Sequence, residues 1–343
     1  MTTPSAPGGP VPATIRDVAA AAGVSTATVS RTFGRPEKVE EATRRRVLDA
    51  AQRLGFAPSG AARTLRTGRT GALGVVVPDL SNPFFPDVVR GVQHAAHEHG
   101  YPLLLADSEE DPAAELPLVR TLARNVDALV LCSPRASDDD LAAAAALRPV
   151  VLVNRELADH PGAAVPPVAI DNADGVRQAV RHLRALGHAR VGFVAGPGTS
   201  SSVAARLAAF RAATADAGAE GVVVGGYEPT LAGGERAADD VLVAGVTGVV
   251  VYNDVMAAGL VGRLQRFGVD VPGRVSVVGF DDIAVSALLT PPLTTVRIPR
   301  AEAGRRAVRR LHAALTGADP AAVAPGPLPT ELVVRASTGP APR

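Results

Sequence analysis

The chain carries, near its start, the segment Thr14-Ile-Arg-Asp-Val-Ala-Ala-Ala-Ala-Gly-Val-Ser-Thr-Ala-Thr-Val-Ser-Arg31, which has the start and stop signals of two short helices. Thr14 followed three residues later by Asp17 fits a capping box, in which each residue bonds the backbone of the other. Gly23 is a residue type that ends helices, and Ser25 can cap a second helix. The segment therefore predicts a helix-turn-helix, a unit that DNA-binding proteins dock in the major groove.

The second predicted helix presents side chains that fit DNA. Its first outward positions are Thr26, Ala27 and Thr28, and Arg31 follows one turn later. In a recognition helix these positions face base edges, and the arginine fork suits guanine O6 and N7. An ordinary helical hairpin with a polar outer face is the alternative. We expect the DNA-binding residues of this segment to be Thr14, Ser25, Thr26, Ala27, Thr28 and Arg31.

The charge distribution favours DNA binding by the N-terminal part. The whole chain is nearly neutral, with 35 lysine and arginine residues against 34 aspartate and glutamate residues. Residues 1–70 hold 11 basic and 5 acidic side chains, so 24 basic and 29 acidic side chains remain after residue 70. A basic first part on an acidic body fits a DNA-binding module joined to a ligand-binding one, because phosphate neutralisation supplies much of the affinity for DNA.

Two further segments extend the predicted DNA-binding part. A third helix is expected from about Glu40 to Leu54, with four apolar side chains facing the first two helices, namely Val47, Leu48, Ala51 and Leu54. Residues 57–70 then predict a helix of only about two turns, which is too short to be stable alone. Within it, Leu65 is either a plain linker residue or an apolar wedge that enters between base pairs.

Over nearly its whole length, the chain resembles the LacI/GalR family of bacterial transcription regulators. The resemblance rests on the order and spacing of these motifs: Thr14-Ile-Arg-Asp-Val-Ala, Gly23-Val-Ser, Val29-Ser-Arg31, Pro58-Ser-x-x-Ala62-Arg-x-Leu65, Asn82-Pro-Phe-Phe85, Gly187-His188, Arg206 with Phe210, Asn253-Asp254, Val278-Gly-Phe-Asp-Asp282, Pro292-Leu-Thr-Thr-Val296 and Arg335-Ala-Ser-Thr338. It implies a homodimer with two recognition helices in the major groove of a pseudopalindromic operator and paired hinge helices in the minor groove. It also implies that Leu65 intercalates at the operator centre and that Ala62 is the small hinge residue permitting close approach.

The rest of the chain predicts an α/β fold. Valine-rich runs alternate with alanine-rich helical stretches, a pattern typical of parallel sheets covered on both faces. The nine runs are residues 73–77, 103–106, 128–131, 150–153, 168–170, 191–194, 222–224, 248–251 and 275–278. Nine strands exceed one compact core, so we expect two doubly wound lobes, as in periplasmic binding proteins, behind the all-α helix-turn-helix domain.

These patterns divide the chain into four predicted parts. They are a tail without defined structure, a helix-turn-helix DNA-binding domain, a hinge helix with its linker, and an effector-binding and dimerisation domain, at residues 1–12, 13–56, 57–70 and 71–343. The two lobes of the last part are expected at about residues 71–170 with 297–327 and 171–296 with 328–340. The C-terminal tail carries no leucine heptad that could join dimers into tetramers, so a homodimer is expected.

Distinctive polar and aromatic residues follow several of the predicted strands. Ligands of such sheets bind outside the carboxyl ends of the strands, and the residues near those ends include Phe84, Phe85, Asp171, Arg206, Asn253 and Asp281. Carboxylate and amide acceptors, an arginine fork and a flat apolar wall suit a polyhydroxylated ligand with partly apolar ring faces. We therefore expect a sugar or sugar-like effector, and the resemblance implies that the same six residues line its pocket.

One segment departs from the family pattern. The family usually has an aromatic residue that stacks on the ligand, and ungapped spacing places Glu228 at that position. A register shift of one residue places Tyr227 there instead, and both alternatives stay open. With Glu228 in the pocket, the expected ligand carries an amine or additional hydroxyl groups.

Other functional classes fit the sequence less well. His94, His97 and His99 lack the four-residue spacing of a zinc-binding helix, so no metal is expected. The glycines after Gly192 lack the full dinucleotide fingerprint, so no cofactor is expected, and the nucleophile elbow or metal set of an enzyme is missing. The first 12 residues resemble neither a secretory signal nor a membrane anchor. We expect a cytoplasmic regulator of transcription, a repressor and not an enzyme, whose partners are operator DNA and a small-molecule effector.

Overall fold

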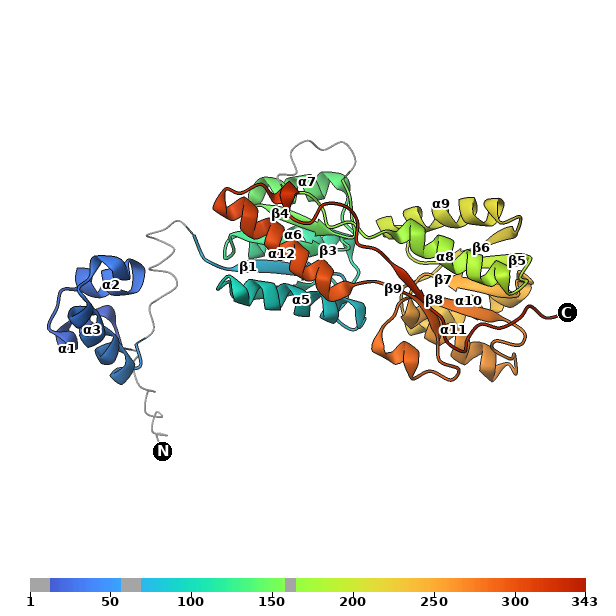
Figure 1. Ribbon diagram of the computed structural model, residues 1–343, viewed down its shortest axis with the longest axis horizontal. Helices are drawn as coiled ribbons and strands as arrows, with labels where there is room; N and C mark the ends of the chain where they lie inside the picture. The colour runs from blue at the N-terminus through green and yellow to red at the C-terminus, as the bar shows by residue number, and fades with distance from the viewer. Residues whose placement is uncertain (1–12, 57–68, 158–164) are drawn as a thin grey trace, which may run out of the picture. The chain divides into compact units, whose positions relative to one another are not determined.

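The computed structural model describes residues 13–56, 69–157 and 165–343 (Figure 1). The chain divides into two compact units, residues 1–70 and 71–343, and each unit is described by itself. The predicted tail and most of the predicted hinge, with Ala62 and Leu65, lie outside the described residues.

The first unit contains three α-helices and one 3-10 turn, α1 (Ile15–Ala22), α2 (Thr26–Gly34), η1 (Pro36–Lys38) and α3 (Glu41–Arg53), in the range that the structure describes. The predicted capping box is present, because the Thr14 backbone N donates to Asp17 Oδ2 over 2.7 Å and the Asp17 N donates to Thr14 Oγ1 over 3.4 Å. Gly23 ends α1 with a φ of 65°. The Ser25 hydroxyl accepts from the Thr28 N over 3.1 Å, so the predicted helix-turn-helix is confirmed.

The core of the first unit is small and differs in part from the prediction. Its buried side chains are Val18, Ala19, Ala22, Val29, Val47, Ala50 and Ala51. Leu48 and Leu54 were expected to face α1 and α2, but both are exposed, at 43% and 40%. A helix turns about 100° per residue, so with Val47 facing inward Leu48 lies at the rim of the stripe and small alanines complete the contact instead.

The second unit is built on two sheets (Figure 1). The first sheet has the strand order β2-β1-β3-β4 and is parallel throughout. Its strands are β1 (Leu73–Val77), β2 (Leu103–Asp107), β3 (Ala128–Cys132) and β4 (Val150–Val153). The second sheet has the order β10-β9-β8-β7-β5-β6, and within it only β10 runs antiparallel to its neighbour. Its strands are β5 (Arg190–Ala195), β6 (Glu220–Gly226), β7 (Gly248–Val251), β8 (Ser276–Asp281), β9 (Thr294–Arg297) and β10 (Glu331–Val333).

Helices cover both faces of each sheet. On the first sheet they are α5 (Phe84–Glu98), α6 (Pro112–Leu122), α7 (Asp138–Leu147) and α12 (Arg300–Thr316), and on the second α8 (Asn172–Ala185), α9 (Ser201–Asp216), α10 (Leu231–Val243) and α11 (Asp254–Arg266). Val75 and Val77 pack in the same core as α5 and α12, whereas Val76 packs with α6 and α7. This alternation is the two-residue period of a strand buried on both faces.

Helices α5 and α12 approach each other through glycines. A Cβ added at Gly91 would lie 2.0 Å from the Ala301 carbonyl oxygen, and one at Gly304 would lie 2.2 Å from the Val88 carbonyl oxygen. Any larger residue would force the two backbones apart. Helix α12 follows β9 of the second sheet but packs on the first, so the chain passes between the lobes more than once.

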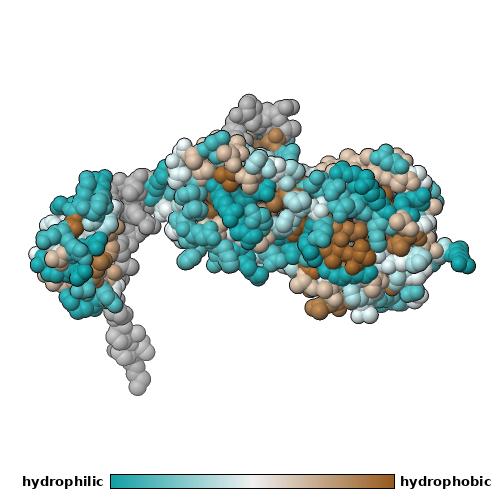
Figure 2. Space-filling view, in the orientation of Figure 1, coloured by the Kyte–Doolittle hydropathy of each residue, from teal (hydrophilic) through white to brown (hydrophobic). Residues whose placement is uncertain are grey.

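The strands differ from the sequence prediction at the crossings between lobes. The predicted strand at residues 168–170 forms only isolated bridges, from Val168 to Val153 and from Ile170 to Leu328. Strands β9 and β10 were not predicted, because both are short and the first is mostly polar or charged in sequence. The face drawn in Figure 2 is largely hydrophilic, with apolar patches on the lobe built on the second sheet. Within the described ranges, no helix is long and apolar enough to cross a membrane.

Candidate functional site

The exposed face of α2 carries the predicted DNA-binding side chains. Thr26, Ala27 and Arg31 are exposed, while Thr28 is half-buried, and its hydroxyl lies 3.0 Å from the Ser25 hydroxyl. Arg31 Nε donates to the Ala27 carbonyl oxygen on its own helix over 3.3 Å. Within the described residues this is the only hydrogen bond of the Arg31 side chain, so its two terminal nitrogens stay available for an outside acceptor.

A small cavity lies where the carboxyl ends of the two sheets meet. Its lining comes from both lobes and consists of Asn82, Phe84, Phe85, Ser133, Arg135, Asn154, Ser202, Arg206, Pro229, Tyr252, Asn253 and Asp281. The cavity measures about 20 Å³, which is room for one water molecule. A larger ligand can enter only if side chains or lobes move apart.

Five of the seven predicted effector residues line the first cavity. Phe84, Phe85, Arg206, Asn253 and Asp281 line this one cavity although up to 197 positions separate them in sequence. Asp171 lines a second cavity that shares Asn154 and Ser202 with the first.

Neither alternative for the ligand-stacking position lines the first cavity. Glu228 is exposed and forms an ion pair with Arg236. The Tyr227 hydroxyl donates to the Asp240 carboxylate. Pro229, the next residue, lines the cavity, and the wall of the cavity includes the aromatic ring of Tyr252, which follows β7.

Arg206 is held rigidly at the base of the cavity. Its side chain is only 3% exposed, its Nε donates to Asn172 Oδ1 over 2.9 Å, and its Nη1 donates to the Tyr252 carbonyl oxygen over 2.5 Å. The guanidinium carbon lies 3.6 Å from the centroid of the Phe280 ring, a cation–π contact. Burial lowers the pKa of Arg206, and Asp281 opposes that shift. No carboxylate lies within 4.0 Å of Arg206 in the part of the chain that the structure describes.

Asp281 is a buried carboxyl group with unused bonding capacity. The residue is 5% exposed, and its carboxyl oxygens make no hydrogen bond within the described ranges. Burial raises its pKa to about 8, while Arg206 lowers it and Asp254 raises it further. Because Asp281 lines the cavity, a ligand bound there can form a hydrogen bond with its carboxyl group.

Several lining residues depart from relaxed backbone geometry. Ser133, Asn154 and Asp281 have φ values of 43°, 57° and 122°, and each lies at or just after the end of a strand. Residues other than glycine hold such values only where the surrounding structure fixes them, and they cluster at functional sites. Their turns direct side chains from strand ends into the cavity.

The lining residues that were not singled out from the sequence include Ser133, Arg135, Asn154 and Tyr252. Asn154 and Tyr252 directly follow predicted strands, and Ser133 and Arg135 lie two and four residues beyond the predicted strand that ends at residue 131. The rule that ligands bind beyond strand ends could therefore have found them. Arg135 pairs with Glu110 through Nε over 2.6 Å and Nη2 over 2.9 Å.

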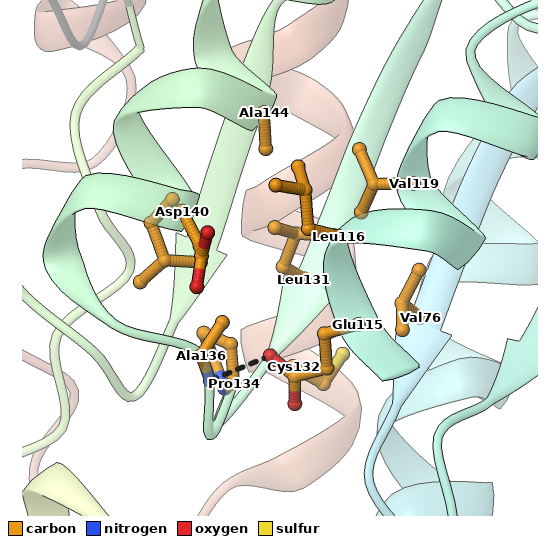
Figure 3. A pocket seen from close by; sticks show the side chains of 11 residues that line it. Val76, Glu115, Leu116, Val119, Leu131, Cys132, Pro134, Ala136, Asp140 and Ala144 are labelled. Atoms are coloured by element: carbon orange, nitrogen blue, oxygen red, sulfur yellow. Dashed lines mark hydrogen bonds between the residues drawn. The ribbon is translucent and has the colours of Figure 1, made fainter. Parts of the chain in front are cut away.

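The loop that carries Ser133 and Arg135 is supported from below by Glu115. This buried carboxylate accepts from the backbone N of Arg135 over 2.7 Å and of Ala136 over 2.8 Å. Figure 3 shows the Glu115–Ala136 bond beside a small apolar pocket between β3, α6 and α7, which includes the buried Cys132. Burial raises the pKa of Glu115, and the two backbone donors oppose the shift. The apolar pocket thus belongs to the core beneath the loop.

Hydrogen bonds connect the lobes through the cavity wall. Asn172, at the start of α8, donates from Nδ2 to Asn154 Oδ1 over 2.8 Å and accepts from Arg206 Nε. Asn154 in turn donates to the Ser133 hydroxyl over 3.2 Å. Arg206 on the second lobe is therefore linked by two amides to Ser133 on the first.

Within the described residues, no group of three or more histidine, cysteine, aspartate or glutamate side chains could hold a metal ion.

Two family models match the chain. The model described as bacterial regulatory proteins, lacI family, matches residues 14–59, and the periplasmic binding protein-like domain matches residues 180–338. The first covers the helix-turn-helix, and the second covers most of the second lobe.

Curated relatives match most of the chain. The HTH-type transcriptional regulator GalR of Escherichia coli strain K12 is 40% identical over 293 residues, which is 84% of this chain and 84% of that protein. The HTH-type transcriptional repressor CytR of the same strain is 34% identical over 334 residues, which is 95% of this chain and 96% of that protein.

Solved structures are similar over both units. A lac repressor dimer bound to operator and the anti-inducer ONPF has a TM-score of 0.85 at 28% identity and covers 96% of this chain and 100% of that one. A complex of the transcriptional regulator CelR with cellobiose has a TM-score of 0.69 at 32% identity and covers 95% of this chain and 99% of that one.

Proposed function

The chain belongs to the LacI family of bacterial regulatory proteins, and we propose that it represses transcription as a homodimer whose operator binding is controlled by a sugar-like effector. The helix-turn-helix of residues 13–56 binds DNA, residues 57–70 form the hinge, and residues 71–343 bind the effector and dimerise. DNA binding places the protein in the cytoplasm, where the chromosome lies.

The exposed face of α2 supports the DNA-binding half of the proposal. Thr26, Ala27 and Arg31 project from the start of a helix whose opposite face is buried in the small core. The arginine is the base-reading residue, because its terminal nitrogens are uncommitted and match the two acceptors of guanine. Ser25 and Thr28 act near the phosphates, and Thr14 does the same from the start of α1.

The Asp281 carboxyl group supports the effector-binding half of the proposal. It is buried, it has no hydrogen-bond donor in the described chain, and it lines the same cavity as the Arg206 guanidinium. A hydroxyl group both donates and accepts, so two neighbouring hydroxyls on one ligand satisfy Asp281 and Arg206 together. The rings of Phe84 and Tyr252 supply apolar surface for the ring face of such a ligand.

We propose binding without chemical conversion of the effector. The other buried carboxyl group near Asp281, that of Asp254, accepts three hydrogen bonds, from the Ile283 N, the Ser286 hydroxyl and the Thr295 hydroxyl. A pair of carboxyl groups with one free acid and one free base is therefore not formed by these two residues. Recovery of unaltered sugar after incubation with the protein tests this part.

The test of the proposed function is a mobility-shift experiment. DNA sequences are first selected by the protein from a random pool, and the retarded fraction is then measured with and without neutral mono- and disaccharides. We expect a palindromic selected sequence and at least one sugar that changes the retarded fraction. Failure to select any sequence contradicts the DNA-binding assignment, and selection without any response to sugars contradicts the effector assignment.

A further inference from the structure

A second and larger cavity adjoins the one that holds Arg206 and Asp281. It measures about 300 Å³, and it lies where the chain first crosses between the lobes. Its walls come from the loop after β4, the segment before α8 and the first turn of α9, and they include Arg155, Asp171, Ser201 and Ala205. Asn154 and Ser202 line both cavities, so the two spaces share a common wall.

The two cavities differ in capacity. The first has room for one water molecule, whereas the second alone reaches the lower end of the volumes of small-molecule sites. A single sugar ring bound by Arg206 and Asp281 would therefore leave most of the larger space to solvent. A ligand of two linked units uses both spaces.

The lining of the larger cavity is suited to a second polar ring. Arg155 donates from Nη2 to Asp138 over 2.5 Å, but its buried Nε has no hydrogen-bond partner in the described chain. One Asp171 carboxylate oxygen caps α8 by accepting from the Asp174 N over 2.8 Å, and the other makes no hydrogen bond within the described residues. Ile170, Ala205 and Pro327 provide aliphatic surface between these polar groups. Alternating donors, acceptors and aliphatic surface fit hydroxyl groups and the C–H face of a sugar.

We propose that the effector of this protein is a disaccharide or glycoside whose second unit binds in the cavity beside Arg155 and Asp171. The proposal rests on the proposed function, because it takes the first unit to bind at Arg206 and Asp281. The second unit contacts the segment of residues 169–173 that links the lobes, so it senses their relative position directly. It therefore contributes both affinity and control of lobe movement.

The test uses two alanines on one helix. Ala205 on α9 lines the larger cavity, whereas its neighbour Ala204 is exposed and does not line it. Ala205→Leu fills part of the cavity, and Ala204→Leu adds the same side chain outside it. Calorimetry on the full chain measures the dissociation constants of glucose, galactose, cellobiose, lactose, maltose and melibiose for the wild type and both variants.

In the wild type, we expect at least one disaccharide to bind tenfold or more tightly than either single sugar. Ala205→Leu should remove that advantage and leave monosaccharide binding within twofold, while Ala204→Leu should change neither. Arg155→Gln, which leaves the backbone wall intact, should weaken the same disaccharide selectively. These selective losses also separate a ligand contact from a folding defect, which would weaken every sugar.

Each other outcome contradicts a defined part of the account. If single sugars bind and regulate DNA binding but no disaccharide binds more tightly, the proposed binding of a second sugar unit is wrong while the proposed function stands. Equal effects of Ala205→Leu and Ala204→Leu on the dissociation constant of a disaccharide also contradict the binding of a second sugar unit in the larger cavity. If none of the sugars binds, both the sugar effector and its extension are wrong.

Discussion

The DNA-binding surface and the effector cavity are constructed in opposite ways. The surface comes from one contiguous segment of 18 residues, Thr14 to Arg31, whose caps, turn and apolar stripe are all local. The cavity draws its lining from positions between Asn82 and Asp281, and both lobes must fold before it exists. The surface residues are largely exposed, whereas Arg206, Asn253 and Asp281 are buried.

This contrast separates the effects of mutation. Exposed residues such as Arg31 contact little of their own unit, so their replacement should alter DNA recognition without unfolding the protein. Buried residues such as Arg206 and Asp281 take part in both the fold and the site, so their replacement should change stability and ligand response together. Substitutions in the two regions should therefore have separable effects on DNA binding and on ligand response.

The largest expected effect is the pH dependence that Asp281 imposes on stability. Its pKa is raised to about 8 by burial, against an ordinary value of 3.8. The folded protein therefore retains a proton that the unfolded chain releases, and the free energy of unfolding should fall as pH rises from about 4 to about 8. One group contributes at most about 1.4 kcal/mol per pH unit to this slope.

Asp281→Asn should flatten that slope, because the amide stays neutral at every pH. Urea denaturation of the wild type and the variant at several pH values measures the slope of the unfolding free energy against pH. Asp239→Asn serves as the control, since Asp239 is an exposed carboxylate on α10 of the same lobe. An unchanged slope in Asp281→Asn contradicts a proton held by Asp281 in the folded state.

Arg206→Ala should cost about 3 kcal/mol of unfolding free energy and abolish the response to effector. The variant leaves Asn172 Oδ1 and the Tyr252 carbonyl oxygen without their donor and removes the contact with Phe280. Arg211→Ala, an exposed arginine on the same helix, should change neither quantity. Denaturation and calorimetry give the two readouts, and a variant that still responds to effector on DNA removes Arg206 from the site.

Arg31→Ala should reverse this pattern. Loss of a bidentate base contact should weaken binding to selected DNA by about 1–3 kcal/mol per half-site and relax the preference at one guanine. The affinity for effector and the free energy of unfolding should stay as in the wild type. Mobility shifts on DNA with each base at that position provide the measurement, and an equal loss on all sequences would make Arg31 a phosphate contact instead.

Thr14→Ala should give the smallest effect, about 1 kcal/mol in the stability of the helix-turn-helix. The hydroxyl of Thr14 accepts from the Asp17 N, and its backbone and hydroxyl both donate to the Asp17 carboxylate. These bonds lower the pKa of Asp17. Hydrogen exchange of residues 15–22 in the full chain should speed up about fivefold, while exchange in residues 71–343 should not change. Faster exchange in both units would contradict a local role.

Features that depend on neighbouring residues could be predicted from the sequence, whereas features that depend on distant residues could not. The caps at Thr14 and Ser25 and the turn at Gly23 were predictable because each depends on residues at most a few positions away. The interior strands were predictable because burial on both faces selects valine. Strands β9 and β10 were not, since a short strand at or near a sheet edge owes its pairing to neighbours far away in sequence.

The cavity was predictable only in part. The rule that ligands bind beyond strand ends found Phe84, Arg206 and Asp281, but Arg135 enters the wall only because Glu110 and Glu115 hold its loop. Glu228 shows the converse limit: its spacing fits the pocket, yet an ion pair with Arg236 holds it at the surface. Pairing between side chains distant in sequence leaves no local signal.

The central claim is that the cavity and the DNA-binding surface are coupled. It is tested most directly by measuring operator affinity at zero and saturating effector, and effector affinity with and without operator, on the same protein. The account predicts that both ratios agree and correspond to a coupling of about 1–3 kcal/mol, because linkage between binding equilibria is reciprocal. Operator affinity that is the same with and without a bound effector would contradict it.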